Sequence, residues 1–174
     1  MTTPAMPPIS TRTEHAGDES AIAEVLRQAF DREEEATLVE QLRASDDVTL
    51  SLVALEDDRI VGHAQFCPIV IHSANEPVPA LALAPLAVLP SHQRQGVGAE
   101  LVRDGLLAVT GLGHRIVTVL GEPDYYIRFG FTTEAAKALE VPFEKSHWMA
   151  MELVPGSLAG VSGRVEYPKA FGIA

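Results

Sequence analysis

Residues 86–103 read Leu-Ala-Val-Leu-Pro-Ser-His-Gln-Arg-Gln-Gly-Val-Gly-Ala-Glu-Leu-Val-Arg, an apolar strand that runs into a glycine turn and then into an amphipathic helix. The helix is predicted to begin near Gly98 and to end at Gly111 or Gly113. Its apolar stripe consists of Leu101, Val102, Gly105, Leu106, Val109 and Leu112. Gly96 and Gly98 leave the backbone open to a ligand, and the free amides of a helix start attract phosphate oxygens. The stretch therefore predicts a site for a phosphate-bearing ligand.

Two common phosphate-binding motifs do not fit this turn. A nucleoside triphosphate loop needs a lysine and a hydroxyl residue after its last glycine, but Ala99 follows Gly98. A dinucleotide fingerprint needs a third glycine where Leu101 stands, and an acidic residue about 20 positions further on. One hypothesis for this turn is therefore a different kind of nucleotide-binding enzyme, and it predicts binding of NAD or ATP.

The remaining pattern, Gln93-Arg94-Gln95-Gly96-Val97-Gly98, resembles the Gln/Arg-x-x-Gly-x-Gly/Ala pyrophosphate loop of the GCN5-related N-acetyltransferases. The flanking sequence supports this resemblance, because apolar strands are predicted at 81–89 and 116–120, before and after the helix. The run Tyr125-Tyr126-Ile127-Arg128-Phe129-Gly130-Phe131 resembles the Phe-Tyr-x-x-x-Gly-Phe segment of that family. The resemblance spans roughly residues 8–153. Residues 163–171 resemble the C-terminal residues of a subgroup of bacterial acetyltransferases. This resemblance does not indicate a substrate.

This resemblance implies an α/β (mixed α+β) fold. The expected single domain has a central mixed, mostly antiparallel sheet that splays after its fourth strand and about four flanking helices. Pro85 fits the bulge expected in that strand, because proline cannot donate to a strand ladder. The resemblance also implies acetyl-CoA as cosubstrate. The residues expected to bind it are Leu86, Ala87, Val88, Gln93, Arg94, Gln95, Gly96, Val97, Gly98, Ala99 and Tyr126.

The implied reaction is direct attack of a primary amine, on a small molecule or peptide, at the acetyl thioester. A backbone amide near Val88 would polarise the carbonyl, and Tyr126 matches the tyrosine that protonates the leaving thiolate. Many relatives carry a glutamate on the strand before the phosphate loop, but no residue from 81 to 88 is ionisable. The base must come from elsewhere, and Glu34 is the first candidate beside Glu33, Glu35, His63 and His72. The missing glutamate also supports an alternative function, a CoA-binding regulatory module with little or no catalysis.

The composition of the chain limits the classes of molecule that it is expected to bind. The formal charge is −11 at pH 7, which disfavours nucleic acid and favours a cationic acceptor attracted by the acids at 31–35. A single cysteine and scattered histidines predict no metal site. No apolar run is long enough to span a membrane and no signal sequence is visible, so a soluble cytoplasmic protein is expected. A homodimer is left open.

The domain prediction divides the chain into a flexible lead at 1–8, an acetyltransferase domain at 9–154 and a C-terminal tail at 155–174 that docks on the domain. An edge strand is expected at 9–13, a helix capped by Asp18, an elbow at 31–35 and a second helix. A hairpin at 48–67 follows, and Pro68 with residues 71–79 is expected to form a connection. Asp124 is expected to cap a short helix that Gly130 ends.

Overall fold

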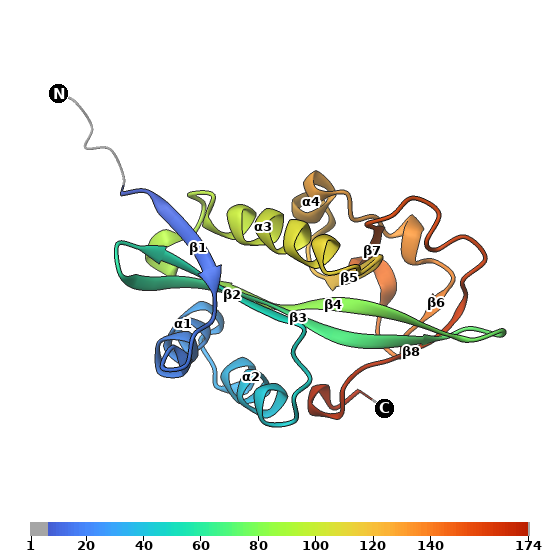
Figure 1. Ribbon diagram of the computed structural model, residues 1–174, viewed down its shortest axis with the longest axis horizontal. Coiled ribbons are helices and arrows are strands. Elements are labelled where there is room, and N and C mark those ends of the chain that lie inside the picture. The colour runs from blue at the N-terminus through green and yellow to red at the C-terminus, as the bar shows by residue number, and fades with distance from the viewer. Residues whose placement is uncertain (1–6, 174) are drawn as a thin grey trace.

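The computed structural model describes residues 7–173, in which an eight-stranded mixed sheet separates two layers of helices (Figure 1). The predicted flexible lead lies mostly outside the described residues. The strands are β1 (Ile9–Thr13), β2 (Leu50–Glu56), β3 (Arg59–His72), β4 (Pro77–Val88), β5 (Ile116–Leu120), β6 (Leu139–Glu140), β7 (Trp148–Glu152) and β8 (Gly163–Glu166). The α-helices are α1 (Glu19–Phe30), α2 (Glu34–Ala44), α3 (Val97–Gly111) and α4 (Pro123–Tyr126). Short 3-10 turns are η1 (Pro90–His92), η2 (Ile127–Phe129), η3 (Glu134–Ala136), η4 (Lys145–His147) and η5 (Lys169–Phe171).

The strand order confirms the expected fold class. The main path runs β1-β2-β3-β4-β5-β7, and all its pairs are antiparallel except β4 with β5. That parallel pair is connected through α3, as a crossover between parallel strands requires. The phosphate-loop candidate is thus the turn between the central strand β4 and its crossover helix.

The strand β4 has the predicted bulge and splay. Ala64 pairs with Leu86 but Phe66 pairs with Leu83, so Ala84 and Pro85 together face one residue of β3. The parallel pairing of β4 with β5 ends at Leu83 and Val119, although β4 continues to Val88. Beyond Leu83, the edge of β4 therefore faces a gap rather than a strand.

Helix α3 covers one face of the sheet, and α1 and α2 cover the other (Figure 1). The close fit of α3 depends on Gly105, because a Cβ atom there would lie 2.5 Å from the Phe66 ring on β3. On the opposite face, α1 buries Ile22, Val25 and Leu26. Both helices pack by one apolar stripe, so their polar faces are left to solvent.

The segment after Pro155 contributes to the sheet. Strand β8 pairs with the end of β3 from Val70 to His72 and with the short strand β6. Its Val165 is buried in a second apolar cluster with Trp148 and Ile71. The turn η5 then contacts α2 on the face away from α3 (Figure 1).

The predicted connection at Pro68 and 71–79 is wrong. Strand β3 runs on to His72 and β4 starts at Pro77, so only 73–76 form the turn. Pro68 is tolerated because it lies between Phe66, where pairing with β2 ends, and Val70, where pairing with β8 begins. One edge of β3 needs no N–H donor at that position.

Two predicted helix caps, Asp18 and Asp124, and one residue predicted to be apolar core, Leu112, differ from the structure. Asp18 precedes α1 but makes no capping bond, since its carboxylate accepts from the His15 amide and pairs with Arg12 at 2.7 Å. Asp124 lies inside α4, which starts at Pro123 after Glu122. Leu112 follows the end of α3 and its side chain is 63% exposed. Gly130 ends the α4–η2 segment in the left-handed conformation, as predicted. No helix within residues 7–173 has the length and apolarity needed to cross a membrane.

Candidate active site

The turn between β4 and α3 exposes a row of backbone amides. Arg94 and Gly96 both adopt positive φ, 61° and 87°, which turns the chain sharply into the helix. Glu100 is the residue whose N–H makes the first bond within α3, to the Gly96 carbonyl at 3.0 Å. The N–H groups of Val97, Gly98 and Ala99 therefore have no partner further back in the helix. Such a helix start favours an anionic group.

A cavity of about 500 Å³ opens in front of this helix start. Two cationic residues, Arg94 and Arg128, line it. A Cβ atom at Gly96 would meet nothing within 4 Å, so that glycine leaves space for a ligand. The cavity is lined by Leu86, Val88, Gln93, Arg94, Gly96, Gly98, Ala99, Tyr125 and Arg128. Seven of these are residues that the sequence predicted as coenzyme-binding.

The four other predicted residues lie beside the lining. Ala87 is buried and pairs with His63, and Val97 is buried beneath Gly62. Gln95 turns its side-chain amide back to the Ser91 carbonyl, at 3.2 Å. Tyr126 is only 9% exposed, although the neighbouring Tyr125 reaches the cavity.

Tyr125 and Arg128 are the two lining residues outside the predicted coenzyme-binding set. The Tyr125 hydroxyl lies 2.9 Å from the position of a Cβ atom on Gly98, so the ring closes on the first turn of α3. Arg128 lies over the ring with its guanidinium carbon 4.6 Å from the ring centroid, and its Nε donates to the Tyr125 carbonyl. Burial raises the pKa of Tyr125, while the charges of Arg128 and Arg103 oppose this shift. The doubled tyrosine in the sequence was the available signal.

The gap between β4 and β5 continues the cavity along the edge of β4. Leu89 donates its N–H to Val61 of β3, at 2.9 Å. Because backbone groups alternate in an antiparallel ladder, the N–H groups of Leu86 and Val88 point away from β3 and into the gap. The Val88 carbonyl accepts from the Gln93 side chain at 2.9 Å. Gln93 thus ties the loop to β4, and the strand amides remain available to a ligand.

Tyr126 packs where β5 ends. Its ring stacks edge-on against Phe131 with centroids 5.8 Å apart, and a Cβ atom on Gly121 would overlap its edge. Burial, with a smaller effect of Tyr125, raises the pKa of Tyr126 to about 12. Its phenol therefore keeps its proton throughout the physiological pH range.

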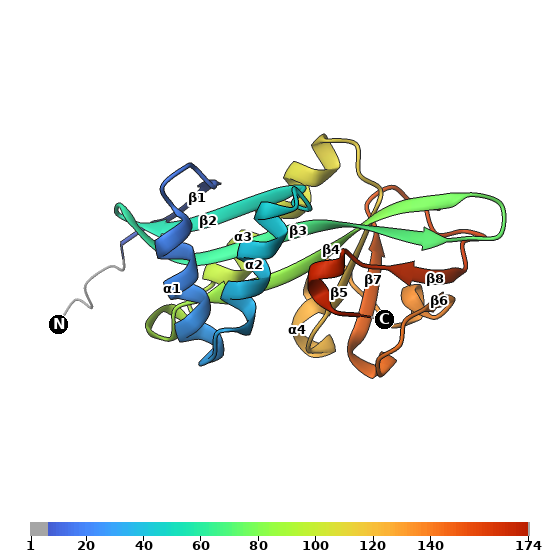
Figure 2. The same cartoon turned by 90° about the horizontal axis from the view of Figure 1, so that it is seen from below.

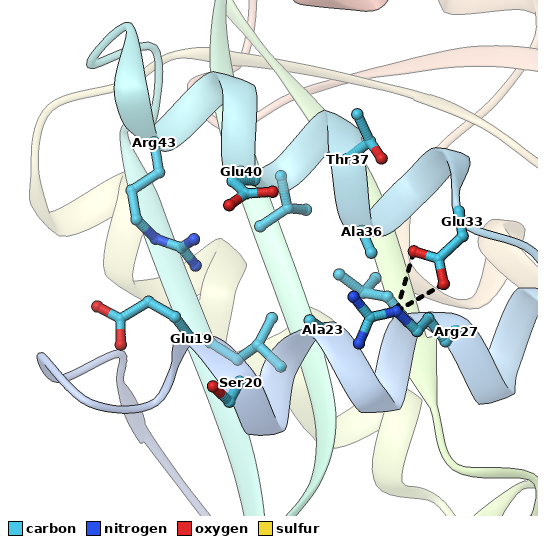
Figure 3. Close-up of a pocket in the computed structure, with 12 residues that line it drawn as sticks. Glu19, Ser20, Ala23, Arg27, Glu33, Ala36, Thr37, Glu40 and Arg43 are labelled. Carbon is cyan, nitrogen blue, oxygen red and sulfur yellow. Dashed lines mark hydrogen bonds and ion pairs between the residues drawn. The ribbon is translucent and has the colours of Figure 1, made fainter.

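The acids of the elbow are mostly neutralised by arginines. Glu33 pairs with Arg27 at 2.8 Å across a cavity of about 250 Å³ between α1 and α2 (Figure 3). Glu35 is bound by the Arg32 guanidinium. Glu34 forms the weakest ion pair of the three glutamates, because its nearest cationic partner is Arg32 at 3.8 Å. Its side chain is 71% exposed and lines a third cavity, of about 590 Å³, beside the C-terminal turn.

The two histidine candidates lie in less open positions. His63 is fully buried and shares a hydrogen bond of 2.9 Å between its Nε2 and the Ser51 hydroxyl. Burial, with a smaller effect of Arg43, lowers the pKa of His63 to about 3, so its ring is neutral at pH 7. His72 lies at the distant end of the β3–β4 hairpin and contacts Glu166 at 3.5 Å. Within the described chain, no three His, Cys, Asp or Glu side chains gather as a metal ion would need.

The sequence of this chain matches the family model of the acetyltransferase (GNAT) domain over residues 10–133. The chain is a GNAT N-acetyltransferase. Among curated GNAT relatives, N-acetyltransferase YhbS of Escherichia coli is 35% identical over 163 residues, 92% of this chain and 96% of the relative. N-acetyltransferase YjhQ of the same species is 35% identical over 153 residues, 82% of this chain and 84% of the relative.

Solved GNAT structures agree with the fold. The crystal structure of Escherichia coli YhbS in complex with CoA superposes with a TM-score of 0.89 at 34% identity, and covers 99% of this chain and 96% of that one. A GNAT acetyltransferase from Brucella melitensis in complex with acetyl-CoA gives a TM-score of 0.79 at 32% identity, covering 94% and 98% of the two chains. The expected family and fold are both confirmed.

Proposed function

We propose that this enzyme transfers the acetyl group of acetyl-CoA to a primary amine on a small molecule or peptide. One observation carries the proposal: the cavity at the start of α3 is continuous in position with the amide-lined gap between β4 and β5. A phosphate-bearing ligand with a long amide-containing arm suits both features. The relatives solved with CoA and acetyl-CoA support this assignment.

The residues present fit the coenzyme. The free N–H groups of Val97, Gly98 and Ala99 would bind its pyrophosphate, with Arg94 and Arg128 supplying positive charge. Leu86 and Val88 would hold the pantetheine arm through the strand amides that face the gap. When bound, acetyl-CoA supplies an activated acetyl thioester.

Two groups of the chain would stabilise the charges that develop. The Val88 N–H would polarise the acetyl carbonyl from the edge of β4. Tyr126 would donate its phenolic proton toward the leaving sulfur. Because the pKa of Tyr126 lies above the ordinary thiol pKa of about 8.5, its main effect is a hydrogen bond to the thiolate, and solvent completes the protonation.

Glu34 is the proposed base. A lysine-like amine with a pKa of about 10.4 is less than about 0.1% neutral at pH 7, so a proton acceptor increases the reactive fraction. The Glu34 carboxylate is exposed and less tightly paired than Glu33 and Glu35. It would also attract the positive charge of the acceptor, in line with the net charge of −11.

A second candidate function is a CoA-binding protein with little turnover. The observation that favours it is the lack of any ionisable side chain on β4 from Leu81 to Val88, where the strand borders the gap. This alternative predicts coenzyme binding without release of free thiol.

The deciding experiment combines calorimetry with turnover. The purified protein is titrated with CoA and then incubated with acetyl-CoA and a panel of polyamines, aminoglycosides, amino acids and peptides. Amine-dependent thiol release and an acetylated product in mass spectrometry support the enzyme. Binding without thiol release supports the second candidate, and absence of CoA binding contradicts both.

A further inference from the structure

The C-terminal segment is anchored at the end of the splayed strand β5. The indole Nε1 of Trp148 donates to the hydroxyl of Tyr167 at 3.1 Å. Trp148 pairs with Leu120, the last residue of β5. Burial raises the pKa of Tyr167, although the hydrogen bond from Trp148 opposes this shift. Tyr167 therefore fastens the segment beside one wall of the β4–β5 gap.

From this anchor the segment crosses to the other wall. Tyr167 stacks edge-on with Phe171, with centroids 5.3 Å apart, which folds residues 167–171 into a compact turn. This turn, η5, contacts α2. Figure 2 shows η5 lying between α2 and the region of β5 and β7, on the face of the sheet that α1 and α2 cover. The segment thus bridges the helix of the elbow and the strand that borders the gap.

A cavity of about 590 Å³ lies at the contact between this turn and α2. Ala170 is its lining residue from the C-terminal segment, and Glu33, Glu34 and Leu38 are among those from α2 and the elbow. The coenzyme cavity lies at the start of α3, the helix that covers the opposite face (Figure 1). The two cavities therefore lie on opposite faces of the sheet.

We propose that residues 167–171 form one wall of the amine-acceptor pocket, opposite Glu34. Tyr167 is a positioning residue that holds the wall, and the small Ala170 leaves room for the acceptor. The class of acceptor that fits is a cationic primary amine, whose ammonium group the exposed carboxylate of Glu34 would attract. This inference rests on the proposed acetyl transfer and specifies the site of its second substrate.

The first test compares two substitutions in the same turn. Ala170→Phe narrows the cavity, whereas Lys169→Phe adds the same ring at the neighbouring exposed residue, outside the lining. Pentane-1,5-diamine is titrated by calorimetry into each protein saturated with CoA. We expect Ala170→Phe to weaken diamine binding at least tenfold, with CoA binding unchanged, and Lys169→Phe to bind as the parent does. Equal diamine affinity in all three proteins, or no diamine binding to the parent, overturns the proposal.

The second test uses Trp148, the single tryptophan of the chain, as a reporter of the anchor. Tyr167→Phe removes the acceptor of the indole N–H but keeps the ring. The tryptophan emission should shift, and the KM of the diamine should rise several-fold with kcat for acetyl transfer nearly unchanged. Shifted emission with an unchanged KM would leave Tyr167 a purely structural role and overturn this assignment. If the parent binds the diamine in the CoA complex but releases no thiol from acetyl-CoA, the acetyl-transfer proposal fails while the pocket stands.

Discussion

The Tyr125 hydroxyl lies 2.9 Å from the position that a Cβ atom on Gly98 would occupy. The segment after β5 thereby closes onto the first turn of α3, and two stretches 27 residues apart in sequence, Gly98 and Tyr125, line one cavity. Gly98 is thus needed for the close approach of the Tyr125 side chain, and we expect the approach of a phosphate to need it as well.

Gly98→Ala should weaken CoA binding about tenfold, or about 1.4 kcal/mol, without destabilising the fold. The added methyl group displaces Tyr125 and narrows the phosphate site, while alanine favours the helix by about 0.5–1 kcal/mol. Calorimetry and thermal unfolding check the two effects. Gly111→Ala is the matched control, because a Cβ atom at the last residue of α3 meets nothing within 4 Å. Equal CoA affinity in both variants contradicts the role of Gly98.

Gly96→Glu should abolish detectable CoA binding. The new carboxylate would occupy the open space before the helix start and repel the pyrophosphate. Gly113→Glu controls for backbone strain, because Gly113 has a similar φ of 97° and equally open surroundings at the other end of α3. A folded Gly96→Glu protein that binds CoA normally in calorimetry would place the pyrophosphate elsewhere.

Tyr126→Phe should lower kcat for acetyl transfer by about 10- to 1000-fold with CoA affinity near normal, because it removes the hydrogen bond to the leaving thiolate, and a positioned proton donor contributes at most about 10²- to 10⁴-fold. Because the pKa of Tyr126 is raised to about 12, its proton is present below that pH. The parent should therefore show no loss of kcat from this group up to about pH 11. Steady-state kinetics from pH 6 to about 11 tests both statements, and unchanged turnover assigns Tyr126 to packing alone.

Gly121→Ala provides an independent test of the same phenol. A methyl group there overlaps the Tyr126 ring and should displace the phenol from its present position. We expect kcat to fall, and the double variant with Tyr126→Phe to be no slower than Tyr126→Phe itself, because both changes remove one interaction. Additive losses in kcat would show that Gly121 acts through another group.

Glu34→Gln should lower kcat by about 10- to 100-fold at pH 7 and by much less near pH 9.5. An amine with a pKa of about 10.4 is about one-tenth neutral at the higher pH, so a base contributes less there. Glu40→Gln, an exposed acid on the same helix, is the control and should leave both rates unchanged. An equal loss for Glu34→Gln at both pH values would indicate binding of the acceptor rather than proton removal, and raised salt should then increase KM.

Much of the fold and the coenzyme-binding part of the candidate site could be predicted from local patterns. The glycine turn at 93–98, the helix after it and the bulge at Pro85 are all short-range features, so the sequence alone located the cavity at the start of α3. Local patterns failed at Pro68, which lies on a strand that changes its partner from β2 to β8. The proline suggested a break in β3, but the strand continues because its edge at Pro68 is paired with neither of these strands.

The sequence by itself determined the family, the glycine turn before α3 and the place of the tyrosine segment, because each depends on residue types within a few positions of one another. Only the tertiary structure decided which of Tyr125 and Tyr126 reaches the cavity at the start of α3, and which acid of the elbow is the least tightly paired. It also brought Ala170 next to Glu34 across more than a hundred residues of chain. Such placements follow from how strands register and helices pack over the whole sheet, and no local spacing encodes them.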